Sequence, residues 1–389
     1  MPAIRPQSRE LIDRLVSFDT TSAKSNLALI DFVQDYLENL GARCRRTSNH
    51  EGSKANLFAS FGPEGPGGVV LSGHSDVVPV DGQTWDSDPF TVVERRGLLY
   101  GRGTSDMKSF LAVALALAPE FQAQLLAKPL HIAMSYDEEV GCTGVGGMID
   151  DIAKNLPRPD MVIVGEPTSM QIVNGHKGCN IFETRITGQA AHSSQPHHGG
   201  NAIMAAGRLI AFLADMAATK RQEAPADGLF DPPYTTFNLG QIEGGRALNI
   251  VAQDCRFGWE FRPIPGEDID GLLQAFETFA EQEVLPALAE FAPEAGIVTE
   301  RMATVPPLAP EHDGAAENLV RHLSGSNAAA GVVSFGTEGG LFQAAGLSTV
   351  IFGPGSIDQA HKPNEFIDLR QVAACEDFML KLRDWAAAN

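Results

Sequence analysis

A histidine and an aspartate stand at the end of an apolar run in VVLSGHSDVVPV, residues 69–80. The β-branched and apolar residues are typical of a buried strand, which ends at His74, with Asp76 two positions later. An imidazole and a carboxylate at a strand end are groups that bind metal ions or move protons. This stretch therefore directs attention to the ends of the other apolar runs.

Further segments carry acids or a histidine after an apolar run or just before a helix. HIAMSYDEE, MVIVGEP, TVIFGPGSIDQAH and LLYGRGTSDMKS supply, in chain order, Asp106, Asp137, Glu138, Glu139, Glu166 and His361. Ligands of open α/β sheets bind beyond the carboxyl ends of the strands, so these groups are expected to meet in one crevice. Two imidazoles with several carboxylates suit zinc or a similar divalent ion, and the number of acids favours two ions.

Each of these residues also has a purely structural interpretation. A single His or Asp after a strand is commonly a helix cap or a turn residue. The recurrence favours the metal, because Glu138 and Glu139 beside Asp137 repel one another unless a cation or solvent neutralises them. A solvated turn remains the alternative for Asp137. The sequence has no G-x-S-x-G elbow, no P-loop spacing, no G-x-G-x-x-G turn and no H-E-x-x-H pair.

Composition and charge narrow the classes of function. The 389 residues are 43% hydrophobic and 20% charged, the balance of a soluble globular protein with two domains. A formal net charge of −20 repels phosphate backbones and anionic lipid, so neither nucleic acid nor a membrane is an expected partner. The absence of a long apolar run and of a signal-peptide core favours the cytosol. Five scattered cysteines without a C-x-x-C pair indicate buried, inert thiols.

The hydrophobic pattern predicts the elements that position these groups. Continuous apolar runs alternate with helical stretches such as 26–40 and 109–126, which predicts a mixed, mostly parallel sheet flanked by helices. From about residue 179 to 290 the strands alternate polar and apolar, and long helices are expected at 201–220 and 268–285.

The expected fold class is therefore α/β with an inserted α+β domain. Residues 1–178 plus 291–389 are expected to form the catalytic domain with the mixed sheet. Residues 179–290 are expected to form an antiparallel sheet with two helices on one face.

Six ordered motifs resemble a known family. SGHSDVVP, YGRGTSDMK, DEEVG, GEP, AAHSSQP and AHKPNE are similar to the co-catalytic dinuclear-zinc family of aminoacylases, dipeptidases and carboxypeptidases. The resemblance covers nearly the whole chain. It implies a zinc-peptidase-like catalytic domain and two divalent ions, zinc or alternatively cobalt. It also implies an inserted domain that serves as a lid and as the dimerisation surface of a homodimer.

The resemblance assigns roles to the clustered residues. The five metal ligands that it implies are His74, Asp106, Glu139, Glu166 and His361. Asp106 would bridge the two ions, with His74 and Glu166 on one ion and the remaining two ligands on the other. Asp76 would accept the second ring N–H of His74 and fix its tautomer.

Glu138 is the expected general base. Metal ions lower the pKa of a bridging water, so Glu138 would take its proton, and the hydroxide would attack an amide carbonyl. Glu138 would then pass the proton to the departing amine.

The expected substrate is a small N-acyl amino acid. SFGTEGGLFQAAGLSTVIFGPGSIDQAHKPNEF is similar to the branch of the family that deacetylates N2-acetyl-L-ornithine to ornithine and acetate, a reaction of arginine biosynthesis. Succinyl-diaminopimelate desuccinylases share the metal motifs but differ in this segment. A desuccinylase, another N-acyl amino acid hydrolase or a dipeptidase remains the alternative. A metal-stabilised binding protein is the alternative of another class, and the presence of Glu138 argues against it.

Four further residues are expected to contact the substrate. The resemblance implies that Asn249 and Arg262 hold its carboxylate; an asparagine turn and a surface salt bridge are the structural alternatives. Glu338 would face the side-chain ammonium of ornithine, or else be a carboxylate at a helix start. His192 matches a histidine that stabilises the oxyanion and is supplied by the partner subunit; a solvated loop histidine is the alternative.

Overall fold

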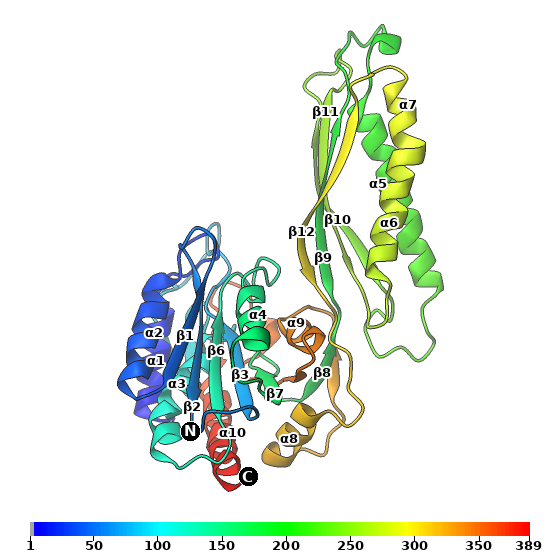
Figure 1. The fold of residues 1–389 in the computed structure, drawn as a ribbon. Helices are drawn as coiled ribbons and strands as arrows, with labels where there is room; N and C mark the ends of the chain where they lie inside the picture. Colours follow the sequence, from blue (N-terminus) through cyan, green and yellow to red (C-terminus); the bar gives the residue numbers. More distant parts are fainter. Residues whose placement is uncertain (1–3) are drawn as a thin grey trace. The chain divides into compact units, whose positions relative to one another are not determined.

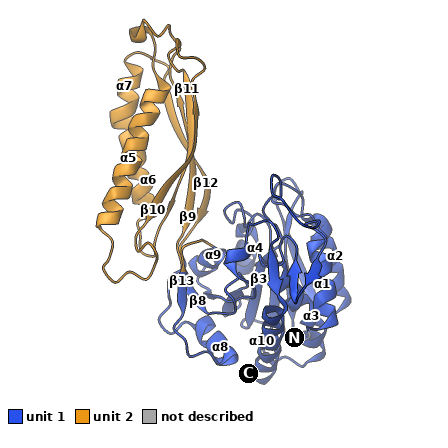
Figure 2. Ribbon diagram, turned by 180° about the vertical axis from the view of Figure 1, so that it is seen from behind, with its two compact units in different colours: residues 1–175, 308–332, 337–389 blue, residues 176–307, 333–336 orange. Residues whose placement is uncertain are grey.

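The computed structural model describes residues 4–389 and divides them into two compact units (Figures 1 and 2). Unit 1 contains the residues up to 175, with 308–332 and 337–389, and unit 2 contains 176–307 and 333–336. The predicted inserted range 179–290 stopped before strand β12 (Gly296–Val305), which pairs with β9 (Cys179–Thr187) in the sheet of unit 2. This pairing extends the second unit to Pro307.

Unit 1 is built on an eight-stranded mixed sheet with the order β1-β2-β6-β3-β7-β14-β8-β13. Its central strands β6, β3, β7 and β14 run parallel, whereas β1, β2 and β8 join by antiparallel pairs. The strands are β1 (Arg43–Ser48), β2 (Ala55–Phe61), β3 (Val69–His74), β6 (Leu130–Ser135), β7 (Met161–Val164), β8 (Val173–His176), β13 (Gly331–Val333) and β14 (Ser348–Ile351). The predicted mixed sheet with a parallel centre is confirmed.

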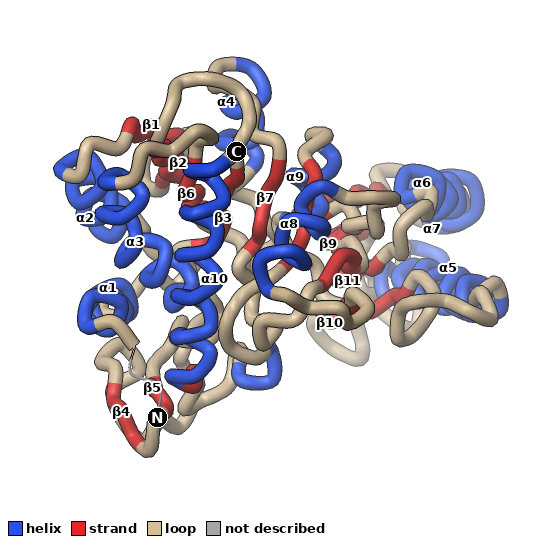
Figure 3. The backbone as a smooth tube through the Cα atoms, turned by 90° about the horizontal axis from the view of Figure 1, so that it is seen from below, coloured by secondary structure: helices blue, strands red, loops and turns tan. Residues whose placement is uncertain are grey.

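Helices cover both faces of this sheet (Figure 3). They are α1 (Pro6–Val16), α2 (Leu27–Asn39), α3 (Lys108–Ala123), α4 (Gly146–Lys154), α8 (Ala315–Ser324), α9 (Gly339–Ala344) and α10 (Leu369–Ala388). In Figure 3, α4 lies on one side of the row of strands, and α1, α2, α3 and α10 lie on the other. Every residue of β3, β6 and β7 is buried, which is why these strands read as continuous apolar runs. A small second sheet joins β4 (Val93–Arg95), β5 (Leu98–Tyr100) and β15 (Phe366–Asp368).

Unit 2 is a four-stranded antiparallel sheet with the order β10-β11-β9-β12. Two further strands, β10 (Thr236–Gly244) and β11 (Asp254–Arg262), and two long helices, α5 (Ala202–Gln222) and α6 (Ile269–Phe279), complete it. The helix α6 continues through a π turn (Ala280–Val284) into α7 (Leu285–Ala289). Buried and less buried residues alternate along β11, because helices cover only one face of the sheet. The core holds Phe182 stacked on Trp259, with ring centroids 4.4 Å apart.

The helix α5 is unusually apolar for a helix of which so little is covered. It has 21 residues and a mean hydropathy of 1.5 in its most apolar window, enough by length and composition to cross a membrane. Leu209 and Leu213 pack in the core of unit 2, whereas Arg208 and Asp215 are exposed. Only 28% of the window is buried. We therefore interpret α5 as the cover of the sheet, whose exposed face combines polar residues with the apolar Ile203 and Met204.

Candidate metal centre

Three parallel strands of unit 1 end at the same edge of the sheet. His74 is the last residue of β3 and lies opposite Ser135, the last residue of β6. The acidic stretch 137–139 follows β6, and Glu166 follows β7, whose Val164 is paired with β3. Parallel neighbours place their carboxyl ends together, so the strands bring these side chains into one crevice.

Asp106 lies between two imidazole rings. Its Oδ1 is 3.1 Å from Nε2 of His74, and its Oδ2 is 3.4 Å from Nε2 of His361. Glu166 Oε1 lies 3.7 Å from the Nε2 atom of His74, and Glu139 Oε2 lies 2.9 Å from that of His361. Each oxygen of Asp106 thus faces a different imidazole–carboxylate pair. This grouping corresponds to the two predicted ligand sets, whose roles as metal ligands stay a prediction.

Glu138 lies in the same cluster. The ligand atoms of His74, Glu138 and Glu166 lie within 4.8 Å of one another, as do those of His74, Asp106 and Glu139. Proximity alone is therefore compatible with Glu138 as a ligand or as a base, and its role as the base stays a prediction. A turn formed by residues 138–142 also brings the buried Cys142 thiol to Glu138, with Sγ 3.4 Å from Oε1. Nothing in the sequence indicated this contact, because only the turn creates it.

Asp76 contacts His74 mainly through its backbone. The Nδ1 atom of His74 is 2.9 Å from the carbonyl oxygen of Asp76 and 3.6 Å from its carboxylate. Because a carbonyl oxygen only accepts, Nδ1 carries a proton, and Nε2 is the ring nitrogen that faces Asp106 and the rest of the cluster. The Asp76 carboxylate accepts the backbone N–H groups of Glu138 at 3.2 Å and Glu139 at 3.3 Å. It thus holds the two acidic residues in place.

Asp137 stands apart from the cluster of ligands. Its Oδ1 lies 2.5 Å from Nζ of Lys54, and both side chains are largely buried. It belongs to neither of the two groups of clustered ligand atoms. Asp137 therefore forms a shielded ion pair with Lys54, in place of the solvated turn that was considered for it.

Burial and crowded carboxylates shift the protonation equilibria of the cluster. Burial raises the pKa values of Glu138 and Glu166 well above the usual range, and neighbouring carboxylates add to the rise. Burial acts in the same direction on Asp106, yet hydrogen bonds from His361 and His74 outweigh it and lower that pKa. Hydrogen bonds to Asp106 and Glu139 raise the pKa of His361 to about 10. The carboxylates of the cluster therefore carry more negative charge than its two imidazoles neutralise.

The donor set fits divalent cations. Nitrogen from two imidazoles and oxygen from three carboxylates, sharing Asp106, are the ligands that zinc and cobalt accept. Bound cations would relieve the repulsion that raises the pKa values of the glutamates. Burial and neighbouring carboxylates raise the pKa of Cys142 well above its usual value, so the thiol next to Glu138 is a protonated hydrogen-bond donor.

Metal analysis checks this assignment. We expect the purified protein, loaded with zinc or cobalt and freed of excess metal, to retain close to two ions per chain, because Asp106 offers one oxygen to each of two positions. Elemental analysis against protein concentration measures the ratio. One tightly bound ion with full activity would contradict the two-ion interpretation.

Residues 70–383 match the protein family described as peptidase family M20/M25/M40. The chain belongs to this family. An acetylornithine deacetylase of Myxococcus xanthus is 37% identical to this M20-family chain over 377 residues, which cover 95% of each protein. An acetylornithine deacetylase of Proteus mirabilis is 37% identical over 389 residues, 97% of this chain and 96% of the relative.

Solved structures share the fold of this M20-family chain. An M20 family metallo-carboxypeptidase from Sulfolobus solfataricus superposes with a TM-score of 0.77 at 16% identity, covering 99% of this chain and 100% of the other. A tripeptidase from Staphylococcus aureus gives 0.73 at 19% identity, covering 98% of each chain. A Bacillus subtilis protein described as a dinuclear metal binding peptidase gives 0.65 at 13% identity, covering 97% and 96%.

Two residues predicted to act on the substrate lie side by side at one end of unit 2 in this M20-family chain. His192 forms an isolated β-bridge with Ile250, and the Ser193 backbone N–H donates to the Asn249 carbonyl at 3.0 Å. The Nδ1 atom of His192 lies 2.7 Å from the Ser194 hydroxyl. Both His192 and Asn249 are exposed. Within unit 2, His192 is thus a solvated loop histidine.

Arg262 lies at the opposite end of the same hairpin. It is the last residue of β11 and pairs with Thr236, whereas Asn249 lies in the loop that joins β10 to β11 at the other end. The nine residues of β11 extend over about 30 Å at ~3.3 Å per residue. Arg262 also forms a forked pair with Glu260, at 3.1 and 3.2 Å. One copy of unit 2 therefore does not bring Asn249 and Arg262 to one small carboxylate.

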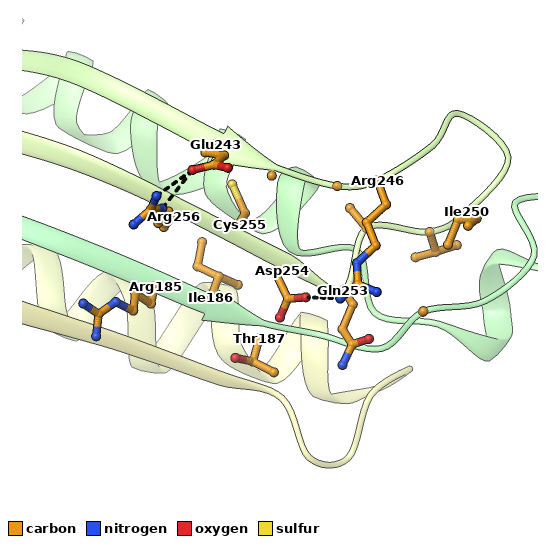
Figure 4. Close-up of a pocket in the computed structure, with 15 residues that line it drawn as sticks. Arg185, Ile186, Thr187, Glu243, Arg246, Ile250, Gln253, Asp254, Cys255 and Arg256 are labelled. Carbon is orange, nitrogen blue, oxygen red and sulfur yellow. Dashed lines mark hydrogen bonds and ion pairs between the residues drawn. The ribbon is translucent and has the colours of Figure 1, made fainter.

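A cavity of about 550 Å³ adjoins the loop that carries Asn249 (Figure 4). Its lining includes Arg185 and Arg256 from the open face of the sheet, and Arg246 and Ile250 from the loop. Arg256 is paired with Glu243 at 2.7 Å, while the pair between Arg246 and Asp254 is long, at 3.8 Å. None of the predicted metal ligands lines this cavity, so it is not the candidate metal centre.

Glu338 precedes α9 in unit 1 and is buried. It is the N-cap residue of this helix, but its side chain makes no capping hydrogen bond, so only an interaction with the helix dipole remains of the helix-start interpretation. Its Oε1 atom has no hydrogen-bond partner among residues 4–389. Burial raises the pKa of Glu338 to about 7. An unpartnered, buried carboxylate oxygen is costly, so this position invites a cationic ligand.

Proposed function

We propose that this M20-family chain is an acetylornithine deacetylase, which hydrolyses N2-acetyl-L-ornithine to ornithine and acetate in the cytosol, as a step of arginine biosynthesis. The observation that carries the proposal is Asp106, whose two oxygens face two imidazole–carboxylate pairs, at 3.1 and 3.4 Å from the rings. The similarity to acetylornithine deacetylases along 95% of the chain supports the choice of substrate. Both relatives at 37% identity are acetylornithine deacetylases, which favours this activity over the desuccinylase, dipeptidase and binding-protein alternatives.

The proposed metal ligands are His74, Asp106, Glu139, Glu166 and His361. Two divalent ions, zinc or cobalt, would polarise the substrate carbonyl and lower the pKa of water. The side chains prepare this site in several ways. The Asp76 carbonyl sets the tautomer of His74, and the Asp76 carboxylate holds the backbone of the segment that carries Glu139.

Glu138 moves the proton in the proposed reaction. Its carboxylate accepts a proton from the attacking water as the new C–O bond forms at the acetyl carbonyl. It then donates that proton to the amide nitrogen as the C–N bond breaks, so that acetate and a free amine leave. The Cys142 thiol, 3.4 Å from Oε1, and the Asp76 carboxylate, which accepts the backbone N–H, hold Glu138 in orientation.

Glu338 is the proposed partner of the ornithine ammonium. It is 1% exposed in a unit whose acidic cluster includes Glu138, and burial raises the pKa of Glu338 to about 7. A substrate that carries a primary ammonium would pair with the unpartnered oxygen of Glu338. Neutral acetyl amino acids offer no such group.

A homodimer through unit 2 is part of the proposal. Asn249 and Arg262 lie at opposite ends of one hairpin, so both can hold the same substrate carboxylate only if two subunits contribute them. Leu248, beside Asn249, is fully exposed, and Ile203 and Met204 at the start of α5 are exposed as well. The strands β10 and β12 are sheet edges, which are surfaces prepared for pairing. We propose that His192 and Asn249 enter the site of the partner subunit.

A substrate panel tests the proposed function. We expect the metal-loaded protein to hydrolyse N2-acetylornithine with a higher kcat/KM than N-succinyl-diaminopimelate, acetylated neutral amino acids or dipeptides, and a chelator to abolish activity. Release of the free amine measures each rate. A preference for the succinylated substrate or for dipeptides would replace the deacetylase by that alternative, and no hydrolysis at all would favour the binding protein.

Replacement of Glu338 tests the specificity. Glu338→Gln is expected to lower kcat/KM for N2-acetylornithine by about 10-fold to 100-fold, since a hydrogen bond to a charged group contributes about 1.5–3 kcal/mol. The same variant should change kcat/KM for N-acetylated neutral amino acids much less. Equal losses on both substrates would assign Glu338 to the structure of the protein.

A further inference from the structure

Glu365 is a buried carboxylate that no step above uses. It is 1% exposed and follows His361 by four residues. Its oxygens accept the backbone N–H groups of Gly103 at 3.0 Å, Ser105 at 2.8 Å and Asp106 at 3.0 Å. Three amides of one short loop thus converge on a single side chain. This loop ends at the residue whose carboxylate faces both imidazole rings.

Arg102 links Glu365 to the segment that carries His361. Its guanidinium is 1% exposed and donates to Glu365 Oε2 at 2.7 Å and to the Lys362 carbonyl at 3.3 Å. A further bond of 2.7 Å runs to the Gln83 side chain. Gln83 in turn donates its amide N–H to the His361 carbonyl at 2.9 Å. Glu365, Arg102 and Gln83 therefore form one network that contacts the backbone beside both Asp106 and His361.

The backbone of His361 needs such support. Its φ of 63° lies in the left-handed region that residues with side chains seldom adopt. Strained conformations of this kind persist where surrounding contacts determine them. The bonds from Gln83 and Arg102 to the carbonyls of His361 and Lys362 supply those contacts.

We propose that Glu365 is a positioning residue for the metal centre, acting with Arg102 and Gln83 to fix Asp106 and His361 relative to each other. The proposal rests on the metal centre of the proposed function and is independent of the acyl group or amino acid accepted. Glu365 contacts neither ring nor carboxylate of the ligands directly. It acts through the backbone of the loop 103–106 and, through Arg102 and Gln83, on the backbone at His361.

The geometry predicts different effects for two variants. Glu365→Gln puts an NH2 group against donors that now meet carboxylate oxygens, so the loop that carries the shared ligand Asp106 loses its anchor. Loss of a partner that orients ligands typically weakens metal binding by about 10-fold to 100-fold. We expect both metal ions to bind more weakly in Glu365→Gln. Gln83→Ala removes the bond to the His361 carbonyl and the bond from Arg102, but leaves the bonds of Glu365 to the loop 103–106 in place. It is therefore expected to weaken mainly the ion at His361 and Glu139, with the other ion nearly unchanged.

Competition with a chromophoric chelator measures these affinities, with Co²⁺ as the probe and the metal-free full chain as the starting material. The visible spectrum of bound Co²⁺ reports the ligand geometry around each ion. A changed spectrum in a variant that is still folded therefore indicates displaced ligands. Thermal unfolding of each metal-free variant reports the cost to the fold. Gln83 is partly exposed, so Gln83→Ala is expected to fold. This variant therefore still tests the proposal if Glu365→Gln does not fold.

Glu311→Gln is the matched control. Glu311 also accepts several hydrogen bonds, from Gln343, Ser348 and the Thr349 backbone N–H at 3.0, 2.6 and 3.1 Å. It binds the first residues of β14, at the end of the parallel strands away from the metal ligands. We expect its Co²⁺ affinity to equal that of the wild type. Wild-type affinity and spectrum in both Glu365→Gln and Gln83→Ala would overturn the proposal, whereas two bound ions without deacetylase activity would overturn only the proposed function.

Discussion

Glu138→Gln is expected to lower kcat for N2-acetylornithine by about 100-fold to 10,000-fold, the range that general acid–base catalysis contributes. The amide keeps the shape of the side chain and one acceptor oxygen for the Cys142 thiol, 3.4 Å away. It does not accept a proton from water at neutral pH. The bound metal should remain close to two ions per chain, because Glu138 is not among the five proposed ligands.

Asp137→Asn is the control for the loss of a carboxylate in the same loop. Asp137 is paired with Lys54 at 2.5 Å and is outside the clustered ligand atoms. We expect a much smaller loss of kcat than in Glu138→Gln. Near-normal turnover in Glu138→Gln together with a large loss in Asp137→Asn would move the general base to Asp137. Loss of one metal ion in Glu138→Gln would identify Glu138 as a ligand instead.

His192→Ala is expected to lower kcat by about 100-fold to 1000-fold, the loss that follows removal of one oxyanion donor. The expectation depends on the proposed homodimer, in which the exposed His192 of one subunit reaches the site of its partner. Metal content should not change, because His192 belongs to unit 2 and all five proposed ligands belong to unit 1. Steady-state kinetics and elemental analysis on the same preparation check both expectations.

His197→Ala is the matched control for His192→Ala. His197 lies in the same exposed loop, five residues later, and its ring packs against that of His198. It is expected to keep wild-type kcat. Equal losses in both variants would indicate that the loop as a whole matters, and no loss in His192→Ala would remove this residue from the chemistry.

Mixing His192→Ala with Glu138→Gln decides which subunit supplies the histidine. If His192 acts in the partner's site, the mixed dimer has one site that lacks both groups and one that is intact. Activity should therefore reappear after subunit exchange. A mixture that remains inactive, with exchange confirmed by tagged subunits, would place His192 in the site of its own chain.

The chemical types of the site were readable from the sequence. His74, Asp137–Glu139 and Glu166 follow continuous apolar runs, and burial of a parallel sheet on both faces forces such runs. The carboxyl ends of parallel strands share an edge, so strand-end position alone predicted that these groups meet. The alternating pattern after residue 179 likewise predicted a sheet covered on one face. The alternation of apolar and polar residues along a strand is a local pattern. It can be read from the sequence because successive side chains of a strand point to opposite faces of the sheet.

Only the tertiary structure decided how these groups contact one another. It gave each oxygen of Asp106 a different ring, at 3.1 and 3.4 Å, and paired Arg262 with Glu260. It also used the Asp76 carboxylate for backbone N–H groups 62 and 63 residues away, and Glu365 for amides about 260 residues away. Such contacts depend on rotamers and on segments distant in the chain, which no local pattern encodes. The extent of unit 2 was decided in the same way, because β12 joins its sheet by pairing with β9, more than 100 residues earlier.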